Sequence, residues 1–321
     1  MKKGLYSALL LSTALLLGAC GNAEDTSSGS KVEQTTKDQT ATANSAQTNE
    51  AVDKLVQVFP QKEMKNVVTT SVTLAEMLHI LDVTPIGLPT TTHQLPKEFE
   101  TIEKVGSPVE PDVEKIVSLK PDIVIGPISV HTSLEKKLKQ TNVASAYLPT
   151  DSYEDLKNDL TALSIVLKKE QLATSYLNEL EKKEQKIIQS LDVKDRKVMI
   201  LFGTGESFML MNTNTYVGSL VNTMGAQNMI TKVSKSKEAY VPLSMENIVA
   251  TNPDVILLVS HGDATVALKQ FKDEVKKNGA WNQLTAFKED RVQALDYSVF
   301  GYASIEKAPQ ALEELQKILA K

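Results

Sequence analysis

Two kinds of hydrophobic pattern alternate along the chain from residue 56 onwards. Short runs of consecutive apolar residues, such as residues 198–202 and 255–259, predict strands that are buried on both faces of a sheet. Stretches in which apolar residues recur every three or four positions, such as residues 72–81 and 152–167, predict amphipathic helices. Residues 56–59 are a further predicted strand. Strands that alternate with helices are typical of α/β proteins.

The sequence contains an internal repeat of one predicted helix-turn-strand unit. Residues 114–125 read EKIVSLKPDIVI and residues 246–257 read ENIVATNPDVIL, so Glu, Ile, Val, Pro and Asp recur at matching places. In the second copy we expect Ile248 and Val249 to face inward. The helix should end before the proline, which lacks an N–H and disfavours helix in the residue before it. Such a repeat predicts two similar α/β lobes.

The expected fold is therefore α/β, with two Rossmann-like lobes at residues 56–168 and 192–321. Residues 169–191 lie between the lobes and carry a helical stripe of apolar residues without internal Gly or Pro. We expect them to form one long, rigid connecting helix. In open α/β sheets, ligands bind beyond the carboxyl ends of the strands. The expected ligand site is a cleft between the lobes.

Three of the four histidines follow predicted strands and are candidates for this cleft. His131 follows the first repeated strand, His261 follows the second, and His93 lies in a polar loop after residues 85–88. A neutral imidazole is a common metal ligand. From its position alone, His261 could equally be a hydrogen-bonding loop residue. The fourth histidine, His79, is interpreted as a surface or packing residue of its helix.

Residues 1–20 predict export and lipid attachment. Lys2 and Lys3 precede a short apolar core that is too short for a membrane span. The sequence LGAC that ends at Cys20 resembles the bacterial lipobox, in which the cysteine receives a diacylglyceryl group. Cys20 is the only cysteine, which favours lipidation over a plain signal peptide with an incidental cysteine and leaves no disulfide. The lipid would hold the protein at a membrane surface.

Residues 21–55 are expected to form a disordered tether. Their first thirty or so positions are mostly Ser, Thr, Gln, Asn, Asp and Ala, with almost no large apolar side chains. Such a segment does not bury enough apolar surface to offset the entropy cost of ordering.

Charge and motif content exclude several function classes. The formal net charge of −5 argues against general nucleic-acid binding. The two arginines, Arg196 and Arg291, precede predicted strands and lie away from the expected cleft loops. Arginine is the residue preferred for paired hydrogen bonds to carboxylate or phosphate, so a highly anionic ligand is disfavoured. No GxSxG or HExxH motif is present, so we expect a binding protein and not an enzyme.

Together these features resemble the cluster III-type substrate-binding lipoproteins of ABC transporters for iron-siderophores, cobalamin and haem. The resemblance covers the chain after the tether and rests on the lipobox, the Glu-x-Ile-Val-x-x-x-Pro-Asp repeats and the helix between them. Within this family the chain is similar to the haem-binding lipoproteins of the Isd type in Gram-positive bacteria. That similarity is concentrated in the segments VGSPVEPDVEKIVSLKPD, MLMNTNTYVGSLVNTMGAQNMI and ENIVATNPDVILLVSHG, and in the VFG loop near Phe300.

The resemblance implies that haem iron is held by a histidine of the second lobe and a methionine of the first. The histidine corresponds to His261, whereas the methionine position holds Val109, which cannot ligate iron. The first-lobe ligand could instead be His131, His93 or Met77, or the iron could be five-coordinate. We favour His131 or five-coordination with Val109 on the open face. The residues expected to contact the ligand are His261, Val109, Tyr240, Phe300, His93 and His131.

Glu114 and Glu246 occupy matching positions in the first turns of the repeated helices. A carboxylate there interacts favourably with the helix dipole, by about 0.3–1 kcal/mol, which is enough to explain either residue alone. The resemblance implies that both dock on basic residues of a membrane permease, a role for which Glu110 is less suited.

The expected function is the capture of haem and its delivery to an ABC permease and its ATPase. The alternative is a binding protein for a ferric hydroxamate siderophore or another iron chelate. The resemblance further implies a monomer that is lipid-anchored to the outer face of a Gram-positive cell membrane. It also implies upstream surface proteins that donate haem as additional partners.

Overall fold

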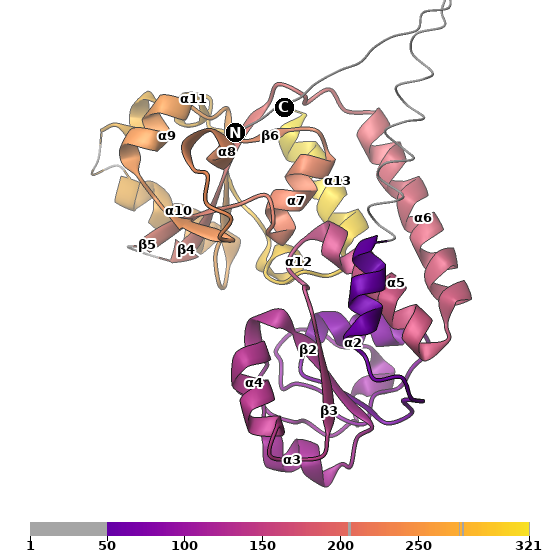
Figure 1. Ribbon diagram of the computed structural model, residues 1–321. Helices are drawn as coiled ribbons and strands as arrows, with labels where there is room; N and C mark the ends of the chain where they lie inside the picture. Colours follow the sequence, from indigo (N-terminus) through magenta and orange to yellow (C-terminus); the bar gives the residue numbers. More distant parts are fainter. Residues whose placement is uncertain (1–49, 205–206, 276, 278, 321) are drawn as a thin grey trace, which may run out of the picture. The chain divides into compact units, whose positions relative to one another are not determined.

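The computed structural model describes residues 50–204, 207–275, 277 and 279–320, which lie in one compact unit, Ala46–Lys321 (Figure 1). The expected signal peptide, Cys20 and the tether as far as residue 49 lie outside the described residues. In the part of the chain that is described, no helix combines the length and the apolar character needed to cross a membrane.

The first described residues form a helix at residues 50–57. The strand expected at residues 56–59 is therefore wrong, and so is disorder over residues 50–55. Val52 and Leu55, three positions apart, lie on the inward face of this helix, with Val52 buried and Leu55 half-buried, and Phe59 just beyond the helix is buried too. Lys54 and Glu50 form an ion pair of 2.7 Å one turn apart.

The first lobe is built on a parallel three-stranded sheet in the order β1-β2-β3. Isolated bridges from Val68 to Gly87 and from Leu88 to Lys104 extend its edge, so the strand expected at residues 85–88 is present only as bridges. The strands are β1 (Val67–Thr69), β2 (Ile123–Pro127) and β3 (Ala144–Leu148). The helices are α2 (Val72–Ile80), α3 (Val113–Ser118) and α4 (His131–Leu138), with 3₁₀ turns at Lys97–Phe99 and Ile128–Val130.

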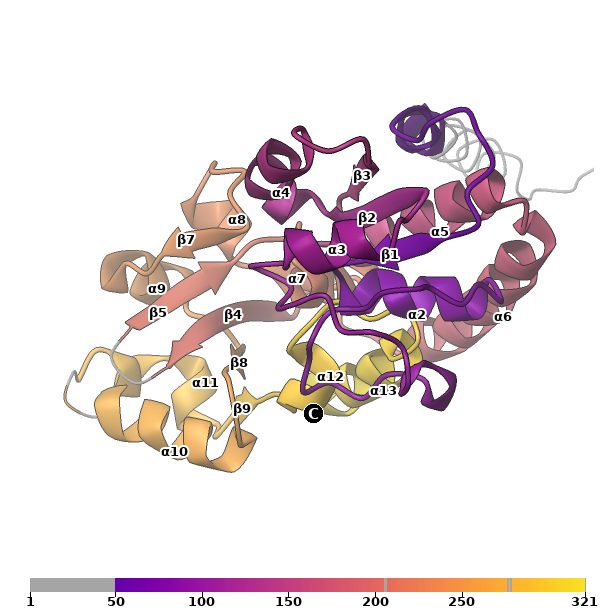
Figure 2. The same cartoon turned by 90° about the horizontal axis from the view of Figure 1, so that it is seen from below.

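Both faces of this sheet are covered, because successive strand residues point to opposite sides. Val67 and Ile123 belong to the core that contains the apolar residues of α2. Val68 and Val124 pack instead with Leu134 of α4. Figure 2 shows β1 and β2 running between α2 and α4. Every strand of the first sheet therefore ends at the same edge, with a loop or turn beyond it.

The second lobe contains a mixed sheet in the order β7-β5-β4-β8-β9, with β6 paired to β4. β4, β8 and β9 are parallel, and β5 is antiparallel to β4. The strands are β4 (Lys197–Thr204), β5 (Ser207–Met211), β6 (Gln227–Asn228), β7 (Tyr240–Pro242), β8 (Val255–Val259) and β9 (Val292–Ala294). The helices are α7 (Tyr216–Thr223), α8 (Ile230–Val233), α9 (Met245–Thr251), α10 (Ala264–Val275), α11 (Thr285–Lys288), α12 (Tyr297–Phe300) and α13 (Ala308–Leu319), with a 3₁₀ turn at Trp281–Gln283.

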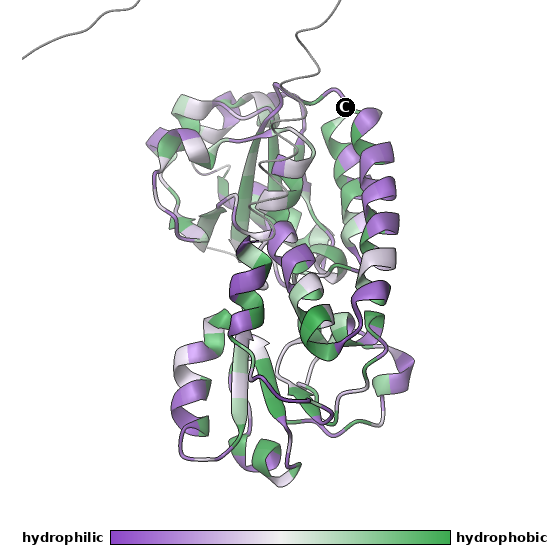
Figure 3. Cartoon of the chain, turned by 45° about the vertical axis from the view of Figure 1, so that its right-hand side comes forward, coloured by the Kyte–Doolittle hydropathy of each residue, from purple (hydrophilic) through white to green (hydrophobic). Residues whose placement is uncertain are grey.

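Two long helices, α5 (Tyr153–Leu167) and α6 (Glu170–Gln189), connect the lobes (Figure 1). The helix predicted over residues 169–191 is observed as α6. It packs against α2 of the first lobe and α13 of the second. At its start, Lys169 contacts Asp82 at 3.8 Å, and near its end Gln316 donates to Ser190 over 2.6 Å. Its outward face is hydrophilic in Figure 3, because only one stripe of α6 is buried.

The structure explains why the repeated motif recurs. Lys120 and Asn252 stand at the same repeat position, directly before the proline, and both adopt a left-handed backbone, with φ of 52° and 41°. The following aspartates cap neighbouring strands. Asp122 accepts the N–H of Asn66 over 2.8 Å, just before β1, and Asp254 accepts the N–H of Lys197 over 2.9 Å, at the start of β4. The Pro-Asp pair therefore has a structural role in both lobes.

The inward orientation expected for Val249 is wrong. Ile248 is fully buried, whereas the side chain of Val249 is 41% exposed. The first copy behaves alike, with Ile116 fully buried and Val117 36% exposed. A short helix buries one stripe only, and the next residue lies about 100° further round its axis.

Candidate ligand-binding site

The carboxyl ends of β3 and β8 lie at a cavity of about 130 Å³ between the lobes. Thr150 and Asp151, which follow β3, line it from the first lobe. Phe202 from β4 and Tyr240 from β7 line it from the second lobe. The cavity is smaller than typical ligand pockets of roughly 300–1,000 Å³, so a larger ligand would extend beyond it into the open cleft. It also includes Phe300 and Tyr302.

A continuous row of aromatic rings, which we call the aromatic row, shares Phe202, Tyr240 and Tyr302 with the lining of this cavity. It begins with His93 of the first lobe, whose ring centroid lies 4.2 Å from that of Tyr302 and 6.1 Å from that of Tyr297. Tyr297 in turn lies 4.8 Å from His261. The row continues from His261 to Phe202 at 5.6 Å and from Phe202 to Tyr240 at 5.4 Å. His93 and His261, from different lobes, thus pack on the same tyrosine.

His261 lies just beyond the carboxyl end of β8, as its place after a buried strand predicts. Its side chain is exposed. Gly262 follows with φ of 91°, a left-handed conformation that glycine adopts without strain, so the chain turns away directly after the imidazole. His261 meets Phe202 edge-on, with an interplanar angle of 78°. Its ring is therefore oriented by aromatic packing and remains open to the cleft.

His93 is half-buried in the loop that follows the bridges at residues 87–88. Its backbone N–H donates to Thr91 Oγ1 over 2.9 Å, a local turn that presents the side chain. Burial lowers the pKa of His93, and the positive charge of Lys307 adds to this effect. The imidazole is therefore held in the neutral form, which is the form that ligates metals.

His131 is placed differently from expectation. It is the first residue of α4 and does not lie in a loop, because a 3₁₀ turn runs from the end of β2 directly into that helix. Its Nε2 atom lies 3.0 Å from Glu135 Oε2, one turn along α4, and its ring packs on Tyr147 at 4.5 Å. His131 is not among the residues that line the cavity or form the aromatic row.

Val109 follows the extended residues 104–106 in the first lobe and is 79% exposed. It borders a second cavity of about 270 Å³, together with Ser133 and Lys137 of α4. Ile128, beyond the end of β2, is also exposed, at 47%. Met77, considered above as an iron ligand, is fully buried in the core.

Sequence reasoning missed Phe202, Tyr297, Tyr302 and Glu76 at this site. Tyr297 and Tyr302 lie in the segment after the last strand, β9, and burial raises the pKa of both. Glu76 on α2 was not considered at all, although it accepts a hydrogen bond from Tyr302 over 2.7 Å. The one available signal was a carboxylate within an otherwise apolar helix.

Glu114 and Glu246 are both exposed in the first turns of α3 and α9, as the repeat predicts. Nothing in their immediate surroundings buries the carboxylates. Both positions are therefore accessible to a partner protein.

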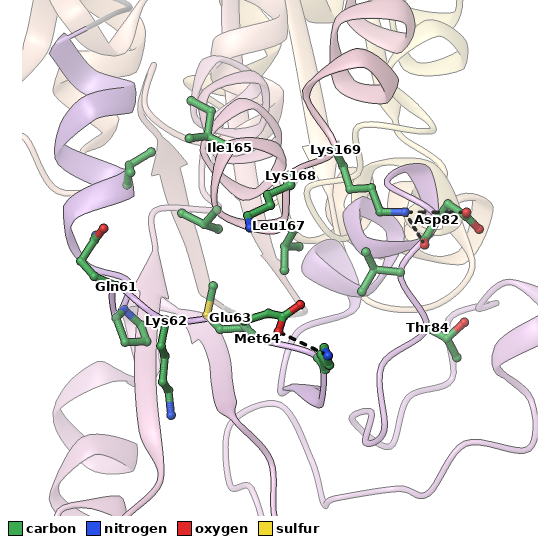
Figure 4. A pocket seen from close by; sticks show the side chains of 15 residues that line it. Gln61, Lys62, Glu63, Met64, Asp82, Thr84, Ile165, Leu167, Lys168 and Lys169 are labelled. Carbon is green, nitrogen blue, oxygen red and sulfur yellow. Dashed lines mark hydrogen bonds and ion pairs between the residues drawn. The ribbon is translucent and has the colours of Figure 1, made fainter.

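A larger cavity of the first lobe, about 650 Å³, lies elsewhere (Figure 4). It is bounded by residues 60–65, which precede β1, and by the carboxyl ends of α2 and α5. Its charged groups are partly paired, with Lys169 3.8 Å from Asp82 and Lys65 3.3 Å from Glu63. This cavity therefore lies at the amino edge of the sheet, opposite the edge where ligands of α/β proteins bind.

Residues 67–298 match the family model described as periplasmic binding protein. The chain belongs to this family. It is 30% identical over 257 residues to the high-affinity heme uptake system protein IsdE of Staphylococcus aureus, covering 79% of this chain and 87% of IsdE. The resemblance to substrate-binding proteins of ABC importers is thereby confirmed.

Solved structures agree with this assignment. An ABC transporter substrate-binding protein from Listeria monocytogenes has a TM-score of 0.73 at 29% identity, covering 80% of this chain and 98% of that protein. S. aureus IsdE complexed with heme has a TM-score of 0.71 at 29% identity, covering 81% of this chain and all of IsdE. S. aureus SirA complexed with staphyloferrin B, at 19% identity and a TM-score of 0.67, covers 81% of this chain and 94% of SirA and shares the fold.

The two-lobed α/β fold expected from the repeat is therefore confirmed. The protein is a substrate-binding protein of an ABC importer for iron compounds, and it is not an enzyme. Such a protein works with a membrane permease and its ATPase.

Proposed function

We propose that this protein captures haem and delivers it to its permease. The observation that carries the proposal is the aromatic row, in which His93 of the first lobe and His261 of the second pack on the same ring, Tyr297. A porphyrin is a large planar π-system, and aromatic side chains stack on or against such surfaces. The similarity to IsdE, named for heme uptake, supports the same cargo.

Iron coordination by this site needs only one or two protein ligands, because a porphyrin supplies four nitrogens of its own. Among the described residues, no three His, Cys, Asp or Glu side chains gather closely enough to hold a bare metal ion. A site with single imidazoles in an aromatic setting suits an iron that arrives inside its chelate. In this proposal His261 is one axial ligand.

His93 is the first-lobe histidine best placed to serve as the second ligand. It packs on Tyr302 and Tyr297, and its imidazole is held neutral. His131 is paired with Glu135 and packs on Tyr147 instead. Val109 and Tyr240 would contribute apolar contact at the exposed rim, and Phe300 would contribute it at the cavity wall.

The haem propionates need donors, and Lys307 is the cation that accompanies the aromatic row. Its Nζ atom lies 4.9 Å from the centre of the Tyr302 ring and donates to the carbonyl of Ser298 over 2.7 Å. A lysine ammonium has three donors, so it can hold a backbone carbonyl and a propionate together. Neither arginine of the sequence lines the cavity.

Anchoring and partners complete the proposal. Cys20 would carry the lipid that retains the exported, monomeric protein at the outer face of a Gram-positive cell membrane. Glu114 and Glu246 would dock on the permease, and haem would arrive from surface proteins upstream. Recovery of the mature chain with a diacylglyceryl group on Cys20, detected by mass spectrometry, would test the anchor.

Titration of the purified protein with haem tests the cargo. A saturable Soret band is expected, which His261→Ala should weaken and shift, while the matched variant His79→Ala should leave it unchanged because His79 lies on α2 outside the aromatic row. The competing cargo, a ferric hydroxamate, would quench tyrosine fluorescence without a Soret band. Saturable quenching by ferrioxamine B, together with no specific haem spectrum, would show that the cargo is a siderophore and not haem.

A further inference from the structure

Glu76 is a buried carboxyl group next to the ligand site. Its side chain on α2 is 2% exposed, and both carboxyl oxygens accept hydrogen bonds. Tyr302 Oη donates to Oε1 over 2.7 Å, and Ser304 Oγ donates to Oε2 over 2.7 Å. Since α2 belongs to the first lobe and residues 302–304 follow α12 in the second, this carboxyl joins the lobes.

The backbone of residues 302–304 is held independently of Glu76. Thr73 Oγ1 donates to the carbonyl of Ala303 over 2.7 Å, and Tyr216 Oη donates to the carbonyl of Ser304 over 2.7 Å. Glu76 therefore controls the orientation of two side-chain hydroxyls and does not set the course of the chain. Its removal should leave the segment in place.

The ring of Tyr302 belongs to the ligand site. One side packs on His93 at 4.2 Å, Lys307 Nζ lies 4.9 Å from its centre, and the residue lines the cavity between the lobes. A hydrogen bond that fixes the Tyr302 hydroxyl therefore also fixes the surface against which His93 rests.

Several groups act on the charge of Glu76. Burial raises its pKa to about 7, the hydrogen bonds from Tyr302 and Ser304 oppose that rise, Glu306 adds to it and Lys307 opposes it. Tyr176 of α6 and Tyr216 of α7 also face it, and both are held neutral by burial. Changes near neutral pH therefore alter the carboxyl itself and not its tyrosine neighbours.

The two protonation states make different bonds. An ionised carboxylate is an acceptor only and takes both hydroxyl bonds, and such charge-assisted bonds are short and strong. A protonated carboxyl carries a hydrogen on one oxygen, so one of the two hydroxyls has to turn and accept that hydrogen, and its bond loses the assistance of the negative charge. The bond that is weakened in this way can be the one to Tyr302.

We propose that Glu76 is a positioning residue that couples its own protonation to ligand retention: ionised, it holds Tyr302 against His93, and protonated, it loosens that contact. The inference rests on the proposed ligand site between the lobes. It predicts tighter retention of cargo in mildly alkaline than in mildly acidic surroundings.

Haem release provides the first test. Dissociation of haem into excess apomyoglobin should be about three- to tenfold faster at pH 6 than at pH 8 for the unaltered protein, the order expected for the net contribution of one ordinary hydrogen bond. Glu76→Gln should abolish this difference while retaining a Soret band, and Tyr302→Phe should also abolish the difference. His79→Gln, on the same helix and bonded to Glu306, should keep it. The same pH dependence in Glu76→Gln and in the unaltered protein would overturn the inference.

A second measurement does not depend on the cargo. In the ligand-free protein labelled at the tyrosine Cζ carbon, the Tyr302 resonance, assigned with Tyr302→Phe, should shift with a midpoint near pH 7. It should not shift in Glu76→Gln. Absence of any haem spectrum would refute the proposed function alone, whereas a Tyr302 titration that persists in Glu76→Gln would refute the role of Glu76.

Discussion

The imidazole of His93 and the phenol ring of Tyr302 pack with their centroids 4.2 Å apart, although the residues belong to different lobes. Through Tyr297 the same ring contacts extend to His261. The counterpart expected for His261 from the repeat, His131, is instead paired with Glu135. The repeat in the sequence therefore favours His131 as the first-lobe partner of His261, whereas the ring contacts favour His93.

Histidine substitutions should separate the possible iron coordinations. If His93 and His261 are both axial ligands, haem-loaded protein should be low-spin, and either alanine variant should convert it to high-spin. His131→Ala should leave the spectrum unchanged, because that ring contacts Tyr147 and Glu135. Absorption and electron paramagnetic resonance spectra provide the measurement.

Three other spectral results would each contradict the bis-histidine arrangement. A high-spin spectrum that changes only in His261→Ala would indicate five-coordinate iron, with Val109 and its neighbours on the open face. Conversion to high-spin in His131→Ala would show that His131 is the second axial ligand, as the repeat in the sequence suggested. An unaltered spectrum in His261→Ala would show that His261 is not an iron ligand.

Asp159 should make stability depend on pH. It is fully buried in α5 with no hydrogen-bond partner for its carboxyl oxygens within the described residues, and burial raises its pKa well above the ordinary value. A raised folded-state pKa gives stability that is complete below the unfolded pKa near 3.8 and is lost as pH rises through the folded value. Asp159→Asn should therefore gain about 1–3 kcal/mol relative to the unaltered chain at pH 9.

Urea unfolding at pH 5 and pH 9 would measure this difference. Asp53→Asn, at an exposed position of the helix at residues 50–57, should behave like the unaltered protein and serves as the control. Parallel pH dependence in Asp159→Asn and the unaltered chain would show that Asp159 is not the titrating group.

Charge reversal at Glu114 and Glu246 together should leave haem affinity intact and stop transport. Both carboxylates are exposed, one on each lobe, and neither lines the cavity. Lysines there would repel a basic permease surface. Growth on haem as the iron source, in a strain that carries only the variant, provides the measurement.

The matched control for helix-end effects is the pair Glu154→Lys and Glu170→Lys. These residues are also exposed in the first turns of their helices, α5 and α6. Normal growth of the control and impaired growth of the Glu114/Glu246 variant is the expected pattern. Equal growth of both variants would show that Glu114 and Glu246 only interact with their helix dipoles and do not dock on the permease.

Cargo binding should cause little relative motion of the lobes. The core that contains Met77 of α2 also contains Leu160 of α5, Leu180 of α6 and Leu312 of α13, so elements of both lobes share one hydrophobic core. A large hinge movement would have to open this close-packed contact. X-ray scattering curves with and without haem should superimpose, and a marked contraction on binding would contradict the rigid connection.

Much of the fold was determined locally and could therefore be predicted from the sequence. The apolar run at residues 255–259, the Ser152 and Asp155 capping box before α5 and the Pro-Asp repeats each act through neighbouring residues or through the period of a regular element. The repeat in turn implied two lobes, and the place of His261 after β8 followed from that. The helix at residues 50–57 was missed because a short apolar run does not distinguish helix from strand.

The composition of the site was decided only by tertiary structure. Tyr302 meets His93 and Glu76 across more than two hundred residues of chain, and no local pattern encodes which side chains of two lobes will meet. The exposure of Val249 beside buried Ile248 likewise depends on which stripe of α9 faces the sheet. His131 and His93 looked equivalent in sequence, since both follow a strand, but a helix that starts at His131 directs its ring to Glu135, whereas the loop around His93 allows its ring to reach the opposite lobe.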